Sequence, residues 1–313
     1  MLYRIAESLY PAWNGLATTV SSRLRPGTNV FSREWDMLVI LDTCRIDALR
    51  AVAPEFDFLP PADEIGSLWS VGSMTAEFVA NTFVSDFEGD FANTAVFAQN
   101  SHYYTVLEER RMPEDERPTV GAWTNWQTVS PNAFEHLDHV WRRTTDDIVT
   151  MESIRATTDA AVHYARRNDP ERLLVHYNRP HHPYRANAIE EDRTDEELHD
   201  HERDPFTYLR EGGDFETVWE SYLDDLRMGL RDVEHLISNV DAENVVITAD
   251  HGDGFGEWGF VYSHPFGFPH PVVRRVPWAE TTASDSGGYE PKPPETDAVH
   301  KSVTDQLEEL GYL

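Results

Sequence analysis

Short apolar runs that end in polar residues constrain the fold of this chain more than any other feature. Three such runs are DMLVILDT, RLLVHYN and NVVITAD, at residues 36–43, 172–178 and 244–250, and TAVFAQN at 94–100 is a weaker fourth. Their length and nearly continuous apolar character are typical of parallel strands that are buried on both faces of a sheet. The sequence therefore predicts a parallel sheet inside the domain.

Helical patterns separate these predicted strands. They cover residues 78–87, 148–168 and 216–240, and a final helix is expected over 298–313. In the third pattern, apolar residues recur at spacings of three and four and form one face of a helix, namely Val218, Tyr222, Leu226, Leu230, Val233 and Ile237. Strands that alternate with helices indicate an α/β domain. We expect a three-layer α/β/α architecture with a mostly parallel central sheet.

The chain length suits one large domain. It has 313 residues, of which 40% are hydrophobic, enough for a sizeable core. We expect residues 36–313 to form this single domain and residues 1–35 to form an N-terminal extension that packs on it. Within the extension, residues 2–20 suit a short amphipathic helix, which we expect to pack on the domain rather than lie on a membrane.

No segment has the features of a membrane span or a secretory signal. No run reaches the roughly 18 apolar residues of a spanning helix, and the N-terminus lacks the apolar core of a signal peptide. The single cysteine, Cys44, excludes an intramolecular disulfide and is consistent with a reducing compartment. These features predict a cytoplasmic protein.

The charge of the chain is strongly negative. It carries 56 acidic and 26 basic residues, a formal net charge of −30, and its only lysines are Lys292 and Lys301. An acidic, lysine-poor surface is typical of proteins adapted to high internal salt, where charge repulsion is screened. The alternative is an ordinary acidic protein. Because no basic stripe is present, we do not expect a nucleic-acid partner.

Polar residues follow the predicted strands at the point where each strand ends. Asp42 ends the first, the HYNRPHHPY loop follows the second, and Asp250 and His251 end the third. In open parallel sheets, ligands bind beyond the carboxyl ends of the strands. The sequence therefore predicts that these side chains meet in one site.

The order of the motifs resembles the sulfatase-like branch of the alkaline phosphatase superfamily. The resemblance covers residues 36–279 in the family's order and rests on VILDTCRIDAL, GSMTAEFVANTF, HYNRPHHPY, TADHGDGFGEWG and SHPFGFPHPVVRRVPW. It implies that Asp42, Asp250 and His251 bind a metal ion. Together with a hydroxyl, these ligands suit one Zn²⁺ or Mn²⁺ ion, with Mg²⁺ or Ca²⁺ as alternatives.

The resemblance also implies the remaining site residues. Ser73 stands at the nucleophile position at the start of a helix, and Thr75 is its rival. His181 would contact the oxyanion or the leaving group. His264 and Arg45 would belong to the substrate-binding part of the site, where Arg45 also shapes the turn after the first strand.

Several residues depart from the family pattern. Sulfatases convert a Cys or Ser in a Cys/Ser-x-Pro/Ala-x-Arg motif to formylglycine, whereas residues 73–77 here are SMTAE. An unmodified Ser or Thr nucleophile favours phosphate esters. Thr43 replaces the second Asp of many sulfatases, and His181 stands where relatives with two zinc ions carry Asp, which favours one metal ion. Glu77 replaces a cationic Arg, and it would repel an anionic substrate unless it contacts the metal or points away.

The function predicted from these residues is a metal-dependent hydrolase or transferase of phosphate (or sulfate) esters. Its substrate would be a small-molecule, glycan or lipid ester, and the oligomeric state stays open. The alternatives are a formylglycine-type sulfatase on sulfated glycans and a catalytically inactive sulfatase-like binding protein. Among the other histidines, we interpret His176 as a core residue, and His136 and His139 as part of an exposed helical face.

Overall fold

A seven-stranded sheet forms the centre of the computed structural model, which describes residues 2–112, 115, 119–143 and 151–292. The strands lie in the order β2-β9-β6-β1-β5-β3-β4. They are β1 (Met37–Leu41), β2 (Gly66–Trp69), β3 (Thr94–Ala98), β4 (His136–His139), β5 (Arg172–Tyr177), β6 (Ala242–Thr248) and β9 (Arg275–Ala283). The pairs from β6 to β4 are parallel, whereas β9 runs antiparallel to both of its neighbours.

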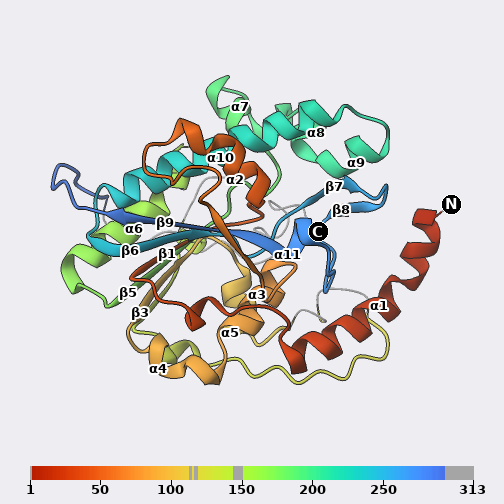
Figure 1. Ribbon diagram of the computed structural model, residues 1–313, viewed down its shortest axis with the longest axis horizontal. Coiled ribbons are helices and arrows are strands. Elements are labelled where there is room, and N and C mark those ends of the chain that lie inside the picture. Colours follow the sequence, from red (N-terminus) through yellow and green to blue (C-terminus); the bar gives the residue numbers. More distant parts are fainter. Residues whose placement is uncertain (1, 113–114, 116–118, 144–150, 293–313) are drawn as a thin grey trace.

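Helices cover both faces of this sheet (Figure 1). One face carries α2 (Ile46–Val52), α6 (Met151–Asn168) and α10 (Phe215–Ile237), and the other carries α3 (Thr75–Thr82), α4 (Glu88–Phe91) and α5 (His102–Leu107). The predicted three-layer α/β/α fold class with a mostly parallel sheet is confirmed.

Smaller elements surround these layers. The helices are α1 (Leu2–Leu24), α7 (Ala186–Glu190), α8 (Asp200–Arg203), α9 (Pro205–Arg210) and α11 (Pro271–Arg274). The strands β7 (Gly254–Glu257) and β8 (Val261–Ser263) form a separate antiparallel hairpin. Single 3₁₀ turns are η1 (Val30–Ser32), η2 (Ala53–Glu55), η3 (Ser85–Phe87), η5 (Pro131–Ala133), η6 (Val140–Arg143) and η7 (Asp195–Glu197).

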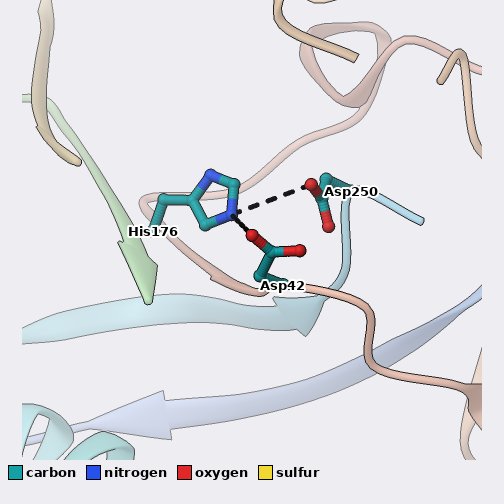
Figure 2. A group of neighbouring side chains, drawn as sticks. All are labelled: Asp42, His176 and Asp250. Atoms are coloured by element: carbon teal, nitrogen blue, oxygen red, sulfur yellow. Dashed lines mark ion pairs between the residues drawn. The ribbon is translucent and has the colours of Figure 1, made fainter. Parts of the chain in front are cut away.

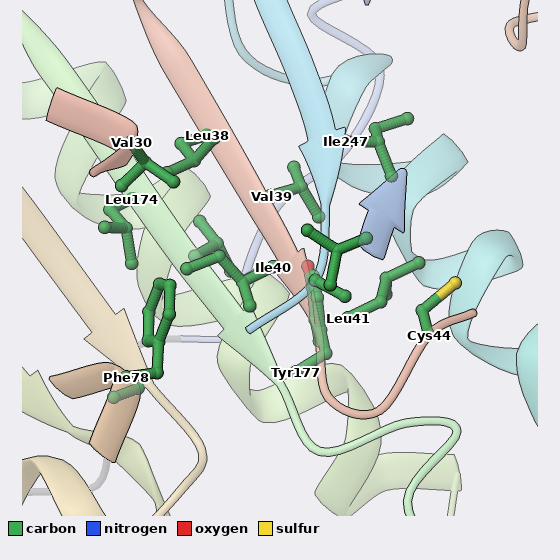
Figure 3. Close-up of a cluster of buried hydrophobic side chains, with 14 of the residues drawn as sticks. Val30, Leu38, Val39, Ile40, Leu41, Cys44, Phe78, Leu174, Tyr177 and Ile247 are labelled. Carbon is green, nitrogen blue, oxygen red and sulfur yellow. The ribbon is translucent and has the colours of Figure 1, made fainter. Parts of the chain in front are cut away.

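Strand β1 lies at the centre of the hydrophobic core (Figure 3). All five of its residues are fully buried, because β5 and β6 pair with its two edges and helices cover its two faces. Phe78 of α3, Leu174 of β5 and Ile247 of β6 belong to the same core cluster. This burial explains why the run DMLVILDT has no polar residue until Asp42, apart from its first.

Helix α3 differs from its prediction over residues 78–87. It begins at Thr75 and ends at Thr82, and the chain then turns into η3. The side-chain amide of Asn29 donates to the carbonyl oxygens of Asn81 and Thr82, at 3.2 and 2.9 Å. This side chain satisfies carbonyl groups that a helix end leaves without a partner, and so stabilises the early stop.

One further prediction is wrong, and another lies outside the described residues. His136 and His139 lie on strand β4, not on a helix, because this segment pairs with β3 in the sheet. Within the acidic stretch 189–204, Glu202 is buried and accepts two hydrogen bonds from Arg193, at 2.7 and 2.8 Å. The helix expected over 298–313 lies outside the described residues.

Candidate active site

The polar residues predicted at the strand ends meet at one edge of the sheet. Asp42 follows β1, Asp250 follows β6, His176 is the penultimate residue of β5, and Asn100 follows β3. These four strands are neighbours in the order β6-β1-β5-β3. Because they run parallel, their carboxyl ends share one edge, and α3 begins there with Thr75.

Two carboxylates and one imidazole form a fully buried group at this edge (Figure 2). Nε2 of His176 lies 4.0 Å from Oδ2 of Asp42 and 3.9 Å from Oδ2 of Asp250. One ligand atom from each residue lies within 4.8 Å of the others, so the group could hold a metal ion. The interpretation of His176 as only a core residue therefore misses its position beside the carboxylates. The available signal was its place on β5, two residues from the polar loop.

Thr75 and His251 complete a compact set of donor atoms. Oγ1 of Thr75 donates to Oδ2 of Asp250 at 2.8 Å and lies 3.4 Å from Nε2 of His251. That nitrogen lies 3.6 Å from Oδ1 of Asp42 and 3.4 Å from Oδ2 of Asp250. Donor atoms about 2.0–2.1 Å from a tetrahedral ion are about 3.3 Å apart. The distances among Thr75, His251 and the two carboxylates lie near this value, whereas the His176 nitrogen is 3.9–4.0 Å from the carboxylate oxygens.

Hydrogen bonds and charge support the same conclusion. Nδ1 of His251 lies 3.1 Å from the carbonyl oxygen of Gly252, which can only accept, so in the neutral ring Nε2 turns a lone pair toward the carboxylates. Oδ1 of Asp42 and Nε2 of His176 are buried and have no hydrogen-bond partner in the described structure, which is rare for buried polar atoms. Both atoms are suitable metal donors.

The imidazole of His176 does not supply a positive charge to balance the carboxylates beside it. Burial lowers the pKa of His176 to about 4, so its ring is neutral at pH 7. Burial and the neighbouring charge of Asp250 raise the pKa of Asp42. Burial also acts to raise the pKa of Asp250, but His251, His176 and a hydrogen bond from Thr75 outweigh it, and the pKa is lowered. A divalent cation would balance the two buried carboxylates.

Further contacts fix the orientation of the carboxylates. The side-chain amide of Asn100 donates to Oδ2 of Asp42 at 2.8 Å, a contact that the sequence did not reveal. The backbone amides of Thr43 and His251 donate to Oδ1 of Asp250, at 3.3 and 2.9 Å. Thr43 has a φ of 64°, a left-handed conformation that is unusual for a β-branched residue. The turn after β1 is thus strained where it meets Asp250.

Ser73 has different neighbours from Thr75. Its backbone amide and its hydroxyl both donate to Oε2 of Glu77 at 2.8 Å, and the hydroxyl also lies 3.1 Å from the carbonyl oxygen of Pro265. Met74, and neither hydroxyl residue, is the N-cap of α3. Of the two predicted candidates, the structure brings Thr75 together with Asp42, Asp250 and His251.

Glu77 points away from this site into a buried ion pair. Its Oε1 accepts from Nη2 of Arg274 at 2.8 Å and from the hydroxyl of Ser21 at 2.6 Å. Glu77 and Arg274 are 0% and 2% exposed. The negative charge of Glu77 is therefore paired with Arg274 and directed away from Thr75.

A second group of imidazoles lies beside the first. The ring of His264 is centred 4.5 Å from the ring of His251 and 5.3 Å from that of His181. Nδ1 of His264 lies 2.7 Å from Oδ1 of Asp253, which fixes the orientation of the ring. Burial lowers the pKa of His181, and burial raises the pKa of Asp253 to about 6. The sequence prediction missed Asp253, although it follows Asp250 and His251 in the same motif.

Arg45 joins the start of α2 to the β7–β8 hairpin. Its guanidinium donates to Asp47 at 2.6 and 2.9 Å, to Glu257 at 2.6 Å and to the carbonyl oxygen of Asp253 at 3.1 Å. It also lies 5.3 Å from the centre of the Trp219 ring. These contacts hold the backbone of Asp253 near β1, while a role in substrate binding stays a prediction.

The sequence matches no family model and no curated protein. Among solved structures, the chain is similar to the periplasmic domain of a phosphoethanolamine transferase from Campylobacter jejuni, with 14% identity, a TM-score of 0.45 and coverage of 79% of this chain and 78% of that one. A lipooligosaccharide phosphoethanolamine transferase from Neisseria meningitidis is 14% identical, with a TM-score of 0.44 and coverage of 81% of this chain and 49% of that one. A 2-O GAG sulfatase is 14% identical, with a TM-score of 0.39 and coverage of 88% of this chain and 70% of that one. At these identities the similarity concerns the fold alone.

Proposed function

We propose that this protein is a metal-dependent hydrolase or transferase of phosphate esters, with Thr75 as the nucleophile. The observation that carries the proposal is the position of the Thr75 hydroxyl, 2.8 Å from Asp250 and 3.4 Å from His251. A hydroxyl that is fixed among two carboxylates and an imidazole is placed for attack on an ester rather than for packing. It also has no role as a helix cap, because the N-cap is Met74.

The start of α3 suits a negatively charged substrate. The first turn of a helix has N–H groups without partners inside the helix, and the helix dipole is positive at this end. The side chain of Met74 does not cap these groups. An ester phosphate placed at Thr75 would therefore meet amide donors from the same helix that carries the nucleophile.

A divalent ion held by Asp42, Asp250 and His251, with His176 beside them, would lower the pKa of a neighbouring hydroxyl and stabilise negative charge on the transferred group. The Thr75 hydroxyl is oriented by its hydrogen bond to Asp250. His264, positioned by Asp253, and His181 beside it are placed to bind ester oxygens or to protonate the leaving group.

The first experiment measures metal content by elemental mass spectrometry on protein purified in molar salt. The wild type should carry about one equivalent of Zn or Mn per chain, because the described residues contain one such set of ligands. Asp250→Asn should lose it, because the variant removes a charged ligand. Thr75→Ala should keep most of the metal but lose roughly 10³-fold or more in turnover of aryl phosphate mono- and diesters.

Ser73→Ala is the matched control, because it removes a hydroxyl two residues from Thr75 and should keep both metal and turnover. If Ser73→Ala abolishes turnover while Thr75→Ala does not, the assignment of the nucleophile is wrong. Hydrolysis of an aryl sulfate, together with a mass change at Ser73, would favour the formylglycine alternative. Wild-type protein that binds neither Zn²⁺ nor Mn²⁺ would favour the inactive binding protein.

A further inference from the structure

Helix α1 is amphipathic, but it turns its polar side toward the domain and its apolar side toward solvent. Its buried side carries polar residues: Asn14, Thr18, Ser21 and Ser22 are each 1% exposed. Its outer side carries large apolar residues, with exposed fractions from 37% to 74%, namely Leu9, Trp13, Leu16, Val20 and Leu24. A surface helix of a globular protein normally turns its apolar side to the core. The apolar side of α1 is therefore built to contact something other than this domain.

Side-chain hydrogen bonds join α1 to helix α3 and to the loop that follows β8. Ser21 donates to Glu77 of α3 at 2.6 Å, and Asn81 of the same helix donates back to Ser21 at 2.8 Å. The indole nitrogen of Trp13 donates to the carbonyl oxygen of Phe266 at 3.0 Å. Since these contacts fix the orientation of the helix, its exposed apolar side is a property of the folded protein.

The β7–β8 hairpin extends the same exposed apolar surface. Trp258 and Phe260 at its tip are 71% and 49% exposed. Trp258 has a φ of 56°, a conformation in which Gly or Asn is normal and a bulky aromatic is rare. A large exposed side chain that is kept at a strained position indicates a role for the side chain itself.

Ring contacts connect the hairpin to α1. Trp258 lies 4.1 Å from His270, His270 lies 6.1 Å from Phe268, and Phe268 lies 6.4 Å from Trp13, each measured between ring centres. Both elements lie at the same end of the molecule in Figure 1. We call this surface the aromatic face, defined as Leu9, Trp13, Leu16, Val20, Leu24, Trp258 and Phe260.

The charge of the aromatic face differs from that of the whole chain. Between residues 9 and 24, Arg23 is the only charged residue, although 26% of the chain is charged and its net charge is −30. Arg23 lies at the end of α1, 4.6 Å from the Trp123 ring, which is 74% exposed. An apolar stripe with tryptophans and a basic residue at its edge is complementary to a lipid bilayer, with its apolar interior and phosphate surface. A second copy would instead bring its own excess negative charge.

We propose that the aromatic face docks on the surface of a phospholipid bilayer, with α1 lying in the plane of the membrane. Within the described residues, no helix is long and apolar enough to cross a membrane, so the contact would be peripheral. The hairpin tip would insert Trp258 and Phe260 beside α1. Because the face is nearly uncharged, docking would depend on apolar insertion and persist at high salt.

Co-sedimentation with phosphatidylcholine vesicles tests the docking, in 0.2 M and in 2 M NaCl. The wild type should sediment with vesicles at both salt concentrations. Leu16→Glu/Leu24→Glu should weaken the partition at least tenfold, and Trp258→Ser should weaken it several-fold. Trp69→Ser is the matched control, because Trp69 is 36% exposed on β2, outside the aromatic face, and this variant should bind like the wild type.

The proposal fails if the wild type stays in the supernatant, or if the variants of the aromatic face bind as well as the Trp69→Ser control. It also fails if light scattering shows a dimer that Leu16→Glu/Leu24→Glu converts to a monomer, since the face would then join two copies. Metal content and turnover of soluble esters are read separately on the same variants and should not change. A failed docking experiment is therefore distinct from a failed catalytic proposal.

Discussion

Replacing Glu77 by glutamine tests the buried ion pair that supports the start of α3. Glu77→Gln keeps the shape of the side chain and removes its charge. In the native protein its carboxylate accepts hydrogen bonds from Arg274, from Ser21, and from the amide and hydroxyl of Ser73, all between 2.6 and 2.8 Å. The glutamine would place an NH₂ group opposite some of these donors and would leave Arg274 charged without its anion.

The expected loss of stability is large because both partners are buried. Removing one partner of a buried ion pair lowers the free energy of unfolding by about 3–5 kcal/mol, since the remaining charge is neither solvated nor paired. For a chain of 313 residues, the entropy of unfolding makes about 1 kcal/mol correspond to roughly 1.5 °C in Tm. We therefore expect Glu77→Gln to unfold roughly 5–8 °C below the wild type.

Thermal unfolding followed by circular dichroism measures this difference, and Glu77→Gln/Arg274→Met is the control. The double variant replaces both charges and should recover part of the loss, because no unpaired charge stays buried. The difference between Glu77→Gln and the wild type should be similar in low and high salt, since buried charges are screened little. A Glu77→Gln variant as stable as the wild type, or a double variant that loses the sum of both single changes, would refute this reasoning.

Two further predictions concern the core and the second group of histidines. Leu230→Ala should lower the free energy of unfolding by about 2–5 kcal/mol, because Leu230 is fully buried on α10. The control Leu24→Ala should change it by less than about 0.5 kcal/mol, because Leu24 is 74% exposed. Equal losses of the two variants in urea unfolding would contradict the assignment of Leu230 to the core. Asp253→Ala should lower ester turnover about 10–100-fold without changing metal content, because His264 loses the carboxylate that orients it. Unchanged turnover would exclude a positioning role for Asp253.

Local sequence patterns determined the layers of this protein and part of its site. Strands β1, β5 and β6 were predictable because short apolar runs between helical patterns have few alternatives to buried parallel strands. The convergence of Asp42 and Asp250 followed from this, since parallel neighbours end at the same edge of the sheet. For these strands, and for Asp42 and Asp250, the pattern that supports the prediction lies within a few residues along the chain.

Only the tertiary structure decided which polar side chains share the site. Thr75 is the first residue of α3, whereas Ser73 precedes the extended N-cap residue Met74, so the point at which α3 begins decides which of the two hydroxyls faces the site. Contacts from distant residues fix that start, with Ser73 bonded to Glu77, and Glu77 to Arg274. His176 likewise became a site residue only through its place between β1 and β3.

The direction in which α1 faces was also decided by tertiary structure. Its sequence shows an amphipathic pattern, and by the usual rule its apolar side would face the core. Polar partners far along the chain, such as Glu77 and Asn81, instead bind its polar side. A periodic pattern specifies that two faces exist, but the hydrogen-bonding groups of the neighbouring layer determine which of the two is buried.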